Sequence, residues 1–527
     1  MKLSESNIEA LNKRQNEVAQ HLKRGYGKSP DGPVIGGGNI VYEVCQKISA
    51  ICCGGLGVIS QLVSQVGLRE AIDDKVEVLA RHLPYHESDH VLTVAYNILN
   101  GGSRIEDIEV IRQDPTILAA LGASRVPDPT TVGDFTRRFT ADTLLDLMDA
   151  INTVRRRVWL RHRDQNRCRS QIKAIAPSLK GDLCFGEAIL DIDGTIAETS
   201  GECKAGMGLS YKGTWGYGPL LISLANTKEP LFLVNRGGNA ASQSNAVPWL
   251  EHAIALMKPV SQRICLRGDT AFSLTEQFDS WTARGIDFVL GYDSHPNLVR
   301  LANDLPEQAW QQLERPAKYE VATQTRRRPA NAKDEFVVAH GYKTLRLQGE
   351  QVAEFDYSPI KCQGHYRMVV VRKNIAVTEG QEHLVDSVRY FFTVTNRTDL
   401  TPAEVVFLAN DRCDQENLIE QLKNGVHAMN MPVQDLNSNW AYMVMASLAW
   451  SLKAWSGLLM PNRRSGAAVV KMEFRKFLQT YVLVPCQIIR SGRRLVYRLL
   501  GYHAQLQDWL DFSKHLRAQP RYRPARC

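Results

Sequence analysis

The chain has 527 residues, of which 44% are hydrophobic, 23% charged and 8% aromatic, and this composition excludes a disordered or fibrous polymer. Its length exceeds what one ordinary hydrophobic core fills, so about two to four domains are expected. The formal net charge of +8 suits a polyanionic partner, although it is a modest excess that many metabolic enzymes match.

The cysteines and the apolar segments predict a soluble cytoplasmic protein. The 11 cysteines are an odd number without a C-x-x-C pair, which fits reduced thiols rather than a disulfide framework or a zinc site. The N-terminus lacks the apolar stretch of a signal peptide, and the most apolar window, Tyr442–Leu452, is too short to span a bilayer. No membrane partner is therefore expected.

Residues 1–180 have the spacing of a mainly helical region. Apolar residues recur at helical intervals over Ile59–Leu79 and His90–Asn100. A further helix is expected to start at Thr130 or Thr131, either of which could cap it. The region suits a small helical DNA-binding module, and it equally suits a plain helical domain.

Basic residues gather in several clusters. A helix from about Leu144 to Arg163 contains Arg155, Arg156 and Arg157 at the start of the strongest basic run. Two further sets are Arg326, Arg327 and Arg328, and the C-terminal residues Arg463, Arg464, Lys471, Arg475, Lys476, Arg493 and Arg494. One such cluster is usually a solvated face, whereas several in one chain favour nucleic acid. We predict that these residues contact mainly phosphates.

From about Gly186 the pattern changes to strands alternating with helices. The expected elements, in order, are strands at Glu187–Asp193, Gly216–Ala225 and Leu231–Asn235, a helix at Ala246–Leu256, a strand at Arg263–Arg267, a helix at Leu274–Arg284 and a strand at Phe288–Leu290. The first three strands predict an antiparallel meander. The whole order is that of an RNase H-like α/β core, with residues 181–294 as its first part.

A second part of this core is expected after an interruption. Residues 295–387 alternate short β-rich pieces with polar and basic stretches, which predicts a β-rich insertion. Residues 388–460 resume the core with the strand Tyr390–Thr395 and a helix from Thr401 to about Gly425, capped by that glycine. Residues 461–527 predict a basic helical C-terminal region. The expected fold is thus α/β, with mainly helical regions flanking the interrupted core.

Three acidic residues stand where a two-metal site would need them. Asp193 and Asp269 end two core strands, and Glu416 lies within the later helix. Paired divalent metals held by carboxylates are the usual means of activating a nucleophile against a phosphodiester. Each residue also has an ordinary interpretation, because an aspartate at a strand end is commonly a turn former and Asp191 alternates with Asp193 on the same strand.

The predicted glutamate helix carries a charged stripe. Arg412, Glu416, Glu420 and Lys423 follow one another at intervals of four, four and three residues and so share one face. A glutamate between cations could hold metal and phosphate together. The stripe could equally be a set of exposed salt bridges that contribute little to stability.

These segments resemble the three catalytic blocks of bacterial insertion-sequence transposases. The blocks are Asp193-Gly-Thr, Arg267-Gly-Asp269 and the helix Asn410–Lys423. In the third block Arg412, Glu416 and Lys423 keep the spacing of a Tyr-Arg-Glu-Lys pattern, whereas Ala409 stands where the tyrosine is usual. The segments Arg236–Ser242 and Asn437–Leu452 extend the resemblance to the thirteen-eighty group of insertion sequences, over roughly residues 90–460.

The resemblance implies a DDE transposase that cleaves element ends and transfers strands into target DNA. It implies Mg²⁺, with Mn²⁺ as a substitute, on Asp193, Asp269 and Glu416, and phosphate contacts from Arg412 and Lys423. The implied partners are the inverted repeats of element ends, target duplex DNA and a second copy of the chain in a synaptic complex near the bacterial nucleoid. A non-cutting DNA-binding protein of transposase ancestry and a nuclease on the same core are the alternatives.

Overall fold

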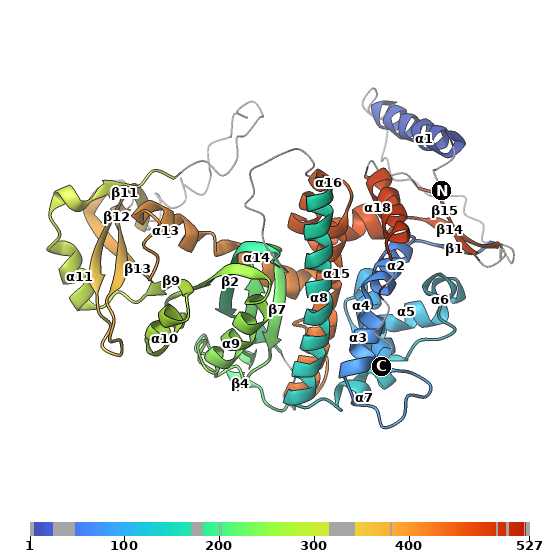
Figure 1. The fold of residues 1–527 in the computed structure, drawn as a ribbon, viewed down its shortest axis with the longest axis horizontal. Helices are drawn as coiled ribbons and strands as arrows, with labels where there is room; N and C mark the ends of the chain where they lie inside the picture. Colours follow the sequence, from blue (N-terminus) through green and yellow to red (C-terminus); the bar gives the residue numbers. More distant parts are fainter. Residues whose placement is uncertain are drawn as a thin grey trace.

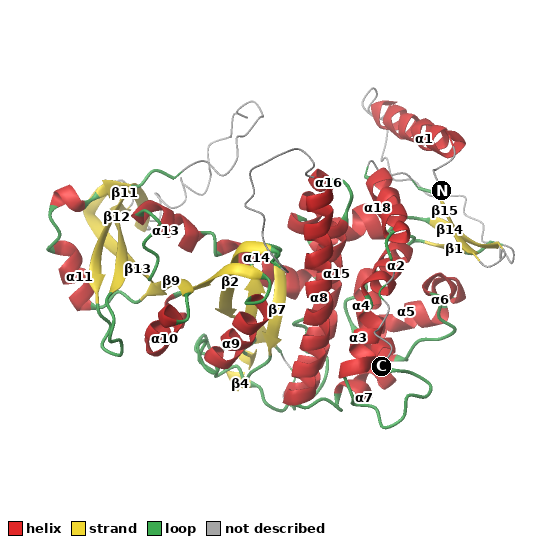
Figure 2. Ribbon diagram, viewed as in Figure 1, coloured by secondary structure: helices red, strands yellow, loops and turns green. Residues whose placement is uncertain are grey.

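The computed structural model describes residues 5–24, 48–169, 183–199, 201, 203–315, 343–379, 382–491, 494–501, 505–520 and 522. Over these residues the fold combines one large mixed sheet with a helical body that is built from both ends of the chain (Figures 1 and 2). Within the described part of the chain no helix has the length and apolar character needed to cross a membrane.

The large sheet has nine strands in the order β10-β11-β12-β13-β9-β8-β2-β6-β7. Their bounds are β2 Phe185–Gly194, β6 Leu220–Leu224, β7 Glu229–Val234, β8 Ser261–Gly268, β9 Ile286–Tyr292, β10 Gln311–Gln312, β11 Lys343–Tyr357, β12 Tyr366–Glu379 and β13 Glu382–Thr395. Strands β2, β8 and β9 are parallel, and β6 and β7 form the predicted antiparallel meander with β2. Helix α9 (Ala246–Met257) has the predicted bounds within one residue, whereas the helix predicted over Leu274–Arg284 is a 3₁₀ turn, Thr275–Gln277, followed by the short α10 (Phe278–Ala283).

One predicted strand is two strands. The segment Gly216–Ala225 divides into β5 (Trp215–Tyr217) and β6, with Gly218 and Pro219 between them. Proline cannot donate to a strand ladder, which explains the break. Strand β5 instead joins β3 (Ala197–Glu198) and β4 (Gly208–Leu209) in a small sheet beside the end of β2.

The insertion continues the core sheet. Strand β13 runs without interruption from residue 382 to 395, and its last four residues pair with β9. The expected boundary between residues 387 and 388 therefore falls inside one strand and is wrong. Strands β11 and β12 extend the same sheet outward, with α11 (Pro296–Asn303) near them (Figure 1). Residues 326–328 lie outside the described part.

Both ends of the chain form one helical body around the long helix α15. The helices of this body are α2 Leu56–Val66, α3 Leu68–Lys75, α4 Glu87–Leu99, α5 Ile108–Gln113, α6 Pro115–Leu121, α7 Pro129–Thr136, α8 Ala141–Arg169, α15 Leu436–Leu459, α16 Arg463–Lys471, α17 Phe474–Phe477 and α18 Leu506–Ala518. Helix α1 (Glu5–Arg24) precedes all of these helices in the sequence. Twenty-two residues of α15 are buried, so this helix is the axis of the body.

Two details of this body differ from the sequence-based expectation. The C-terminal region is not wholly helical, because β14 (Cys486–Ser491) and β15 (Arg494–Leu499) form a hairpin that pairs with β1 (Ala50–Ile51). Helix α7 is capped by Asp128, whose carboxylate accepts the Thr131 N–H at 2.9 Å, and not by a threonine. Pro129 at the first helical position makes the aspartate the natural cap.

Candidate active site

The two aspartates lie at the same edge of the sheet. Strands β2 and β8 are parallel, and Asp191 pairs with Arg267 in their register. Asp193 and Asp269 each follow two residues later, so they lie side by side at the carboxyl ends of neighbouring strands and on one face. Asp269 also caps the 3₁₀ turn Thr270–Phe272 by accepting the Ala271 N–H at 3.0 Å.

Asp191 has a structural role. Both of its oxygens accept hydrogen bonds from the Arg267 guanidinium, at 2.6 and 2.8 Å, and both side chains are buried. Asp191 is therefore unavailable to a ligand, which leaves Asp193 as the candidate metal ligand of the strand.

The glutamate segment crosses the sheet in two helices. Helix α13 (Pro402–Asn410) begins with a capping box at Thr401 and packs Val405 and Val406 against Cys265 and Val289. The chain then turns at residues 411 and 412 before α14 (Cys413–Glu420) and a π-helical turn, Gln421–Gly425. The single helix expected over residues 401–425 is thus wrong, and so is the glycine cap, because the cap position after this turn is Val426.

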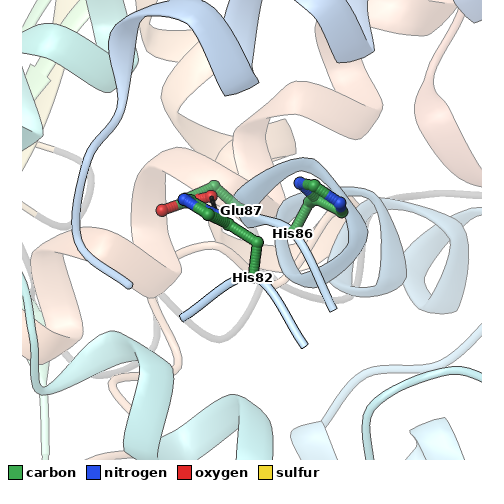
Figure 3. A group of neighbouring side chains, drawn as sticks. All are labelled: His82, His86 and Glu87. Atoms are coloured by element: carbon green, nitrogen blue, oxygen red, sulfur yellow. Dashed lines mark hydrogen bonds and ion pairs between the residues drawn. The ribbon is translucent and has the colours of Figure 1, made fainter. Parts of the chain in front are cut away.

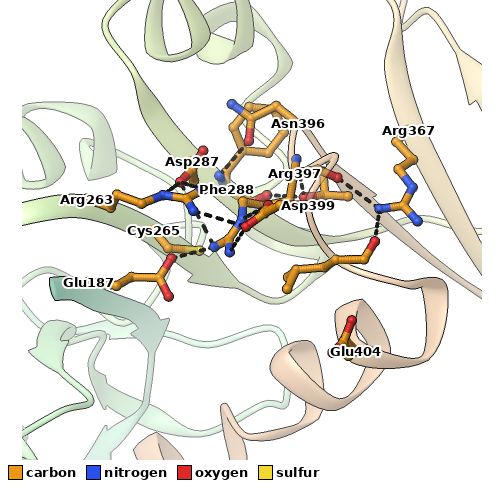
Figure 4. A network of polar contacts seen from close by, with 12 residues as sticks. Glu187, Arg263, Cys265, Asp287, Phe288, Arg367, Asn396, Arg397, Asp399 and Glu404 are labelled. Atoms are coloured by element: carbon orange, nitrogen blue, oxygen red, sulfur yellow. Dashed lines mark hydrogen bonds and ion pairs between the residues drawn. The ribbon is translucent and has the colours of Figure 1, made fainter. Parts of the chain in front are cut away.

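A polar network fixes the start of this segment at the opposite edge of the sheet (Figure 4). The buried guanidinium of Arg397 donates to Asp399 at 2.7 and 2.8 Å and also to Glu187 on β2. Arg263 on β8 joins Asp287 on β9 to the same Asp399, at 2.7 and 3.0 Å. Helix α13 therefore starts at the amino ends of the parallel strands and carries α14 to their carboxyl ends.

Arg412 lies between two of the predicted ligands. Its Nη1 is 3.1 Å from Asp193 Oδ2, and its Nη2 is 3.5 Å from Glu416 Oε1. The Arg267 guanidinium holds the preceding helix α13 by donating to the Leu408 carbonyl at 2.9 Å. Glu416 is 59% exposed at its side chain, whereas Asp193 is 15% exposed, so the glutamate borders the solvent side of the site.

The pKa of Asp193 reflects the charges of all three carboxylates. This pKa is raised to about 6, mainly because burial disfavours the charged form. Arg412 opposes the rise, whereas the nearby charges of Asp269 and Glu416 add to it. The site thus holds more negative charge than one guanidinium neutralises, and hard carboxylate oxygens are the ligands that Mg²⁺ and Mn²⁺ prefer. The donor set fits a divalent cation.

The ligand atoms of Asp193, Asp269 and Glu416 do not all lie within 4.8 Å of one another, the spacing expected for ligands of one ion. Among the described residues, only His82, His86 and Glu87 bring three ligand atoms within 4.8 Å of one another (Figure 3). In that group the buried Glu87 carboxylate accepts the Val78 and Leu79 N–H groups at 3.3 and 3.1 Å and contacts His82 Nδ1 at 3.1 Å. It holds the preceding loop against α4, which accounts for its burial.

Arg155, predicted to contact DNA, is a core residue. It is 1% exposed, and its Nε donates to Glu229 Oε1 at 2.9 Å. The indole N–H groups of Trp159 and Trp455 donate to the same carboxylate at 2.9 and 2.7 Å. A guanidinium paired in this way cannot reach a phosphate, so the prediction for Arg155 is wrong.

The remaining predicted basic residues differ in their accessibility. Arg157 donates to the carbonyls that end α2, at 3.1 Å, and stacks on Tyr522 with 3.7 Å to the ring centre. Arg156 is partly buried in the same helix, and residues 326–328 are outside the described part. Lys423 is half-buried in the π-helical turn that follows α14. Exposed cations occur instead on and after α16, namely Arg464, Lys471, Arg475 and Lys476.

Three comparisons with known proteins bear on the family of the chain. The family described as transposase DDE domain group 1 matches residues 48–519. No curated protein matches the chain significantly. Among solved structures the chain is similar to the cryo-EM structure of the piggyBac transposase synaptic complex with hairpin DNA, at 12% identity over 81% of each chain. The TM-score of that likeness is 0.32, at which it supports no conclusion about function.

Proposed function

Because the chain belongs to the transposase DDE domain group 1 family, we propose that it is a metal-dependent DNA transposase of the thirteen-eighty group with an RNase H-like core. The observation that supports this most directly is the position of Asp193 and Asp269 at the carboxyl ends of neighbouring parallel strands, with Arg412 joining Asp193 to Glu416 beside them. The strand order β7-β6-β2-β8-β9, with three parallel and two antiparallel strands, supports the proposed core.

In this proposal the three carboxylates hold the cation and the neighbouring cations hold the substrate. Asp193, Asp269 and Glu416 would bind Mg²⁺ or Mn²⁺, which when bound would neutralise charge on the attacking and leaving oxygens. Arg412 already bridges Asp193 and Glu416, so it neutralises part of their charge without a metal and can turn to a phosphate once a metal is bound. Lys423 borders the same site and supplies a second phosphate contact.

The proposed substrate is double-stranded DNA at element ends and at the target. Exposed cations of the C-terminal body, Arg464, Lys471, Arg475 and Lys476, are the proposed contacts with flanking phosphates. The proposed assembly is a homodimer that pairs two ends.

The test compares purified wild-type protein with Glu416→Gln on a labelled duplex that carries the element's end, in Mg²⁺. Glu420→Gln is the matched control, because it removes a carboxylate one turn further along the same segment. We expect cleavage by the wild type and the control, and loss of cleavage with retained DNA binding in Glu416→Gln. Binding without cleavage in all three proteins would indicate the non-cutting alternative. Cleavage without joining of the 3′ end to target DNA would indicate the nuclease.

A further inference from the structure

A polar cavity of about 350 Å³ adjoins the candidate metal site. One wall begins at Gly194 and Thr195, directly after Asp193, and Lys423 contributes another side. The remaining walls are the hairpin β4–β5 and the loop 236–242. This cavity is called the basic cavity below. Its lining does not include the proposed metal ligands Asp193, Asp269 and Glu416.

The loop that forms one wall is built by close backbone contact. A Cβ on Gly238 would lie 2.4 Å from the Gly208 carbonyl oxygen and 2.5 Å from that of Gly216, so only glycine allows this approach. Arg236 holds the loop by donating from Nε to the Gly218 carbonyl at 2.9 Å and from Nη1 to the Ser244 carbonyl at 2.7 Å. The wall is therefore a formed structure.

Three cations line the basic cavity: Lys212, Arg236 and Lys423. Within the described residues, Lys212, Arg236 and Lys423 form no ion pair with a carboxylate, and Glu198 is the acidic residue that also lines the cavity. Burial lowers the pKa of Arg236 to about 10 and also lowers that of Lys423, a shift that Glu420 and Asp193 oppose and Lys212 increases. Three cations held together in this way favour an anionic ligand.

An exposed aromatic side chain stands at the rim of the basic cavity. Tyr211 is 85% exposed and lies at the tip of the β4–β5 hairpin, next to Lys212. The tip is tight, because the Ser210 N–H donates to the Thr214 carbonyl at 2.9 Å and Gly213 has a φ of 74°. On the same hairpin Trp215 is 55% exposed. Aromatic faces next to cations are the general means of binding unpaired nucleotides, whose bases are free to stack.

We propose that the basic cavity binds unpaired nucleotides of a single-stranded DNA end, with Tyr211 stacking on a base and Lys212, Arg236 and Lys423 neutralising phosphates. Within a fully paired duplex stacking covers the base faces except at the terminal pairs, so unpaired nucleotides offer Tyr211 far more base surface on which to stack. The proposal rests on the proposed function, since it names the form of the DNA at that same site. The strand held in the basic cavity would continue directly past Asp193.

The experiment measures binding without metal, by fluorescence anisotropy in EDTA, of a labelled blunt duplex and of the same duplex with four unpaired nucleotides at its 3′ or 5′ end. The full-length variants are Tyr211→Ala, Tyr211→Phe and Lys212→Ala. Lys258→Ala is the matched control, because Lys258 is exposed but precedes β8 and so lies at the opposite edge of the sheet.

We expect wild-type protein to bind one of the overhang duplexes about tenfold more tightly than the blunt duplex. Tyr211→Ala and Lys212→Ala should lose this preference, whereas Tyr211→Phe and Lys258→Ala should retain it. Equal binding of all duplexes by the wild type, or a full preference in Tyr211→Ala, would overturn the proposal. Because cleavage of the end duplex and its loss in Glu416→Gln are measured separately, either proposal can fail while the other stands.

Discussion

Asp191 and Arg267 face each other across the parallel pair β2–β8 and join through two hydrogen bonds of 2.6 and 2.8 Å in the buried sheet. The same guanidinium donates to the Leu408 carbonyl of α13. This ion pair thus holds together the two strand ends that precede Asp193 and Asp269. Through Leu408 the same guanidinium also holds α13, the helix before Glu416.

Replacement of Asp191 should therefore destabilise the fold, and replacement of Asp193 should not. Asp191→Asn leaves the buried guanidinium without its counter-charge, for which we expect a loss of about 3–5 kcal/mol in the free energy of unfolding. Asp193→Asn removes a carboxylate whose charged form is already disfavoured, so we expect a change within about 1 kcal/mol and loss of cleavage. Urea unfolding followed by circular dichroism measures both variants. A loss of stability in Asp193→Asn as large as that in Asp191→Asn would contradict this account.

Arg412 should compete with the metal ion. Its guanidinium lies 3.1 Å from Asp193 and 3.5 Å from Glu416, so a cation that binds both carboxylates must displace it. Arg412→Gln keeps a polar side chain but removes the charge, and we expect it to bind Mn²⁺ several-fold more tightly than the wild type, in isothermal titration calorimetry without DNA. Asp193→Asn is the control and should bind Mn²⁺ more weakly. Unchanged or weaker binding by Arg412→Gln would show that the guanidinium does not occupy the metal position.

Arg155 should affect stability more than DNA binding. Arg155→Met leaves Glu229 buried without its partner, which should cost about 3–5 kcal/mol, and Arg155→Met with Glu229→Gln should recover part of that loss. Trp159 and Trp455 both donate to Glu229, so tryptophan fluorescence should report the unfolding. The exposed Arg464→Ala is the control, with an expected change within about 0.5 kcal/mol. Selective loss of DNA affinity in Arg155→Met, at unchanged stability, would restore the DNA-binding prediction.

His90 should make the protein less stable in mild acid. Burial lowers its pKa from 6.5 to about 4, although Asp89 and Glu87 oppose the shift, and its ring stacks on Phe135. Between these two pKa values the unfolded chain binds more protons than the folded chain, so stability falls as the pH drops from 6.5 towards 4, by about 3 kcal/mol. Unfolding free energies of wild type and His90→Phe at several pH values measure this contribution. Parallel curves for the two proteins would contradict it.

The sequence predicted the elements whose pattern is local. The strand ending at Asp193 and the meander that follows it are apolar runs separated by turn residues, and such patterns depend little on the rest of the chain. The aspartates could be named because a strand end is a local feature. The closeness of Glu416 to them came from the resemblance, since no spacing along the chain specifies it.

The errors arose where tertiary contacts decide. The basic run that begins at Arg155 suggests a solvated face. In the structure, however, Arg155 is buried and pairs with the buried Glu229 of β7. Residues 494–499 were predicted to be helical but form β15. Exposed residues such as Arg494 and Arg498 alternate there with partly buried ones, which is the period of a strand. The glutamate helix likewise breaks at residues 411 and 412, where Arg412 contacts Asp193 on a distant strand. Only the folded chain supplies such information.

Strand β13 connects the insertion directly to the core sheet. A strand cannot slip by one residue in its ladder without exchanging its buried and exposed faces, so β13 is held in register with β9 over its last four residues and with β12 from Val385 to Thr395, up to the bulge beyond Val385. The loop after it leads through Arg397 directly into α13. The insertion and the helix that leads to Glu416 are therefore joined through one strand of the core sheet, so binding at β11 and β12 would act on the carboxylates through β13.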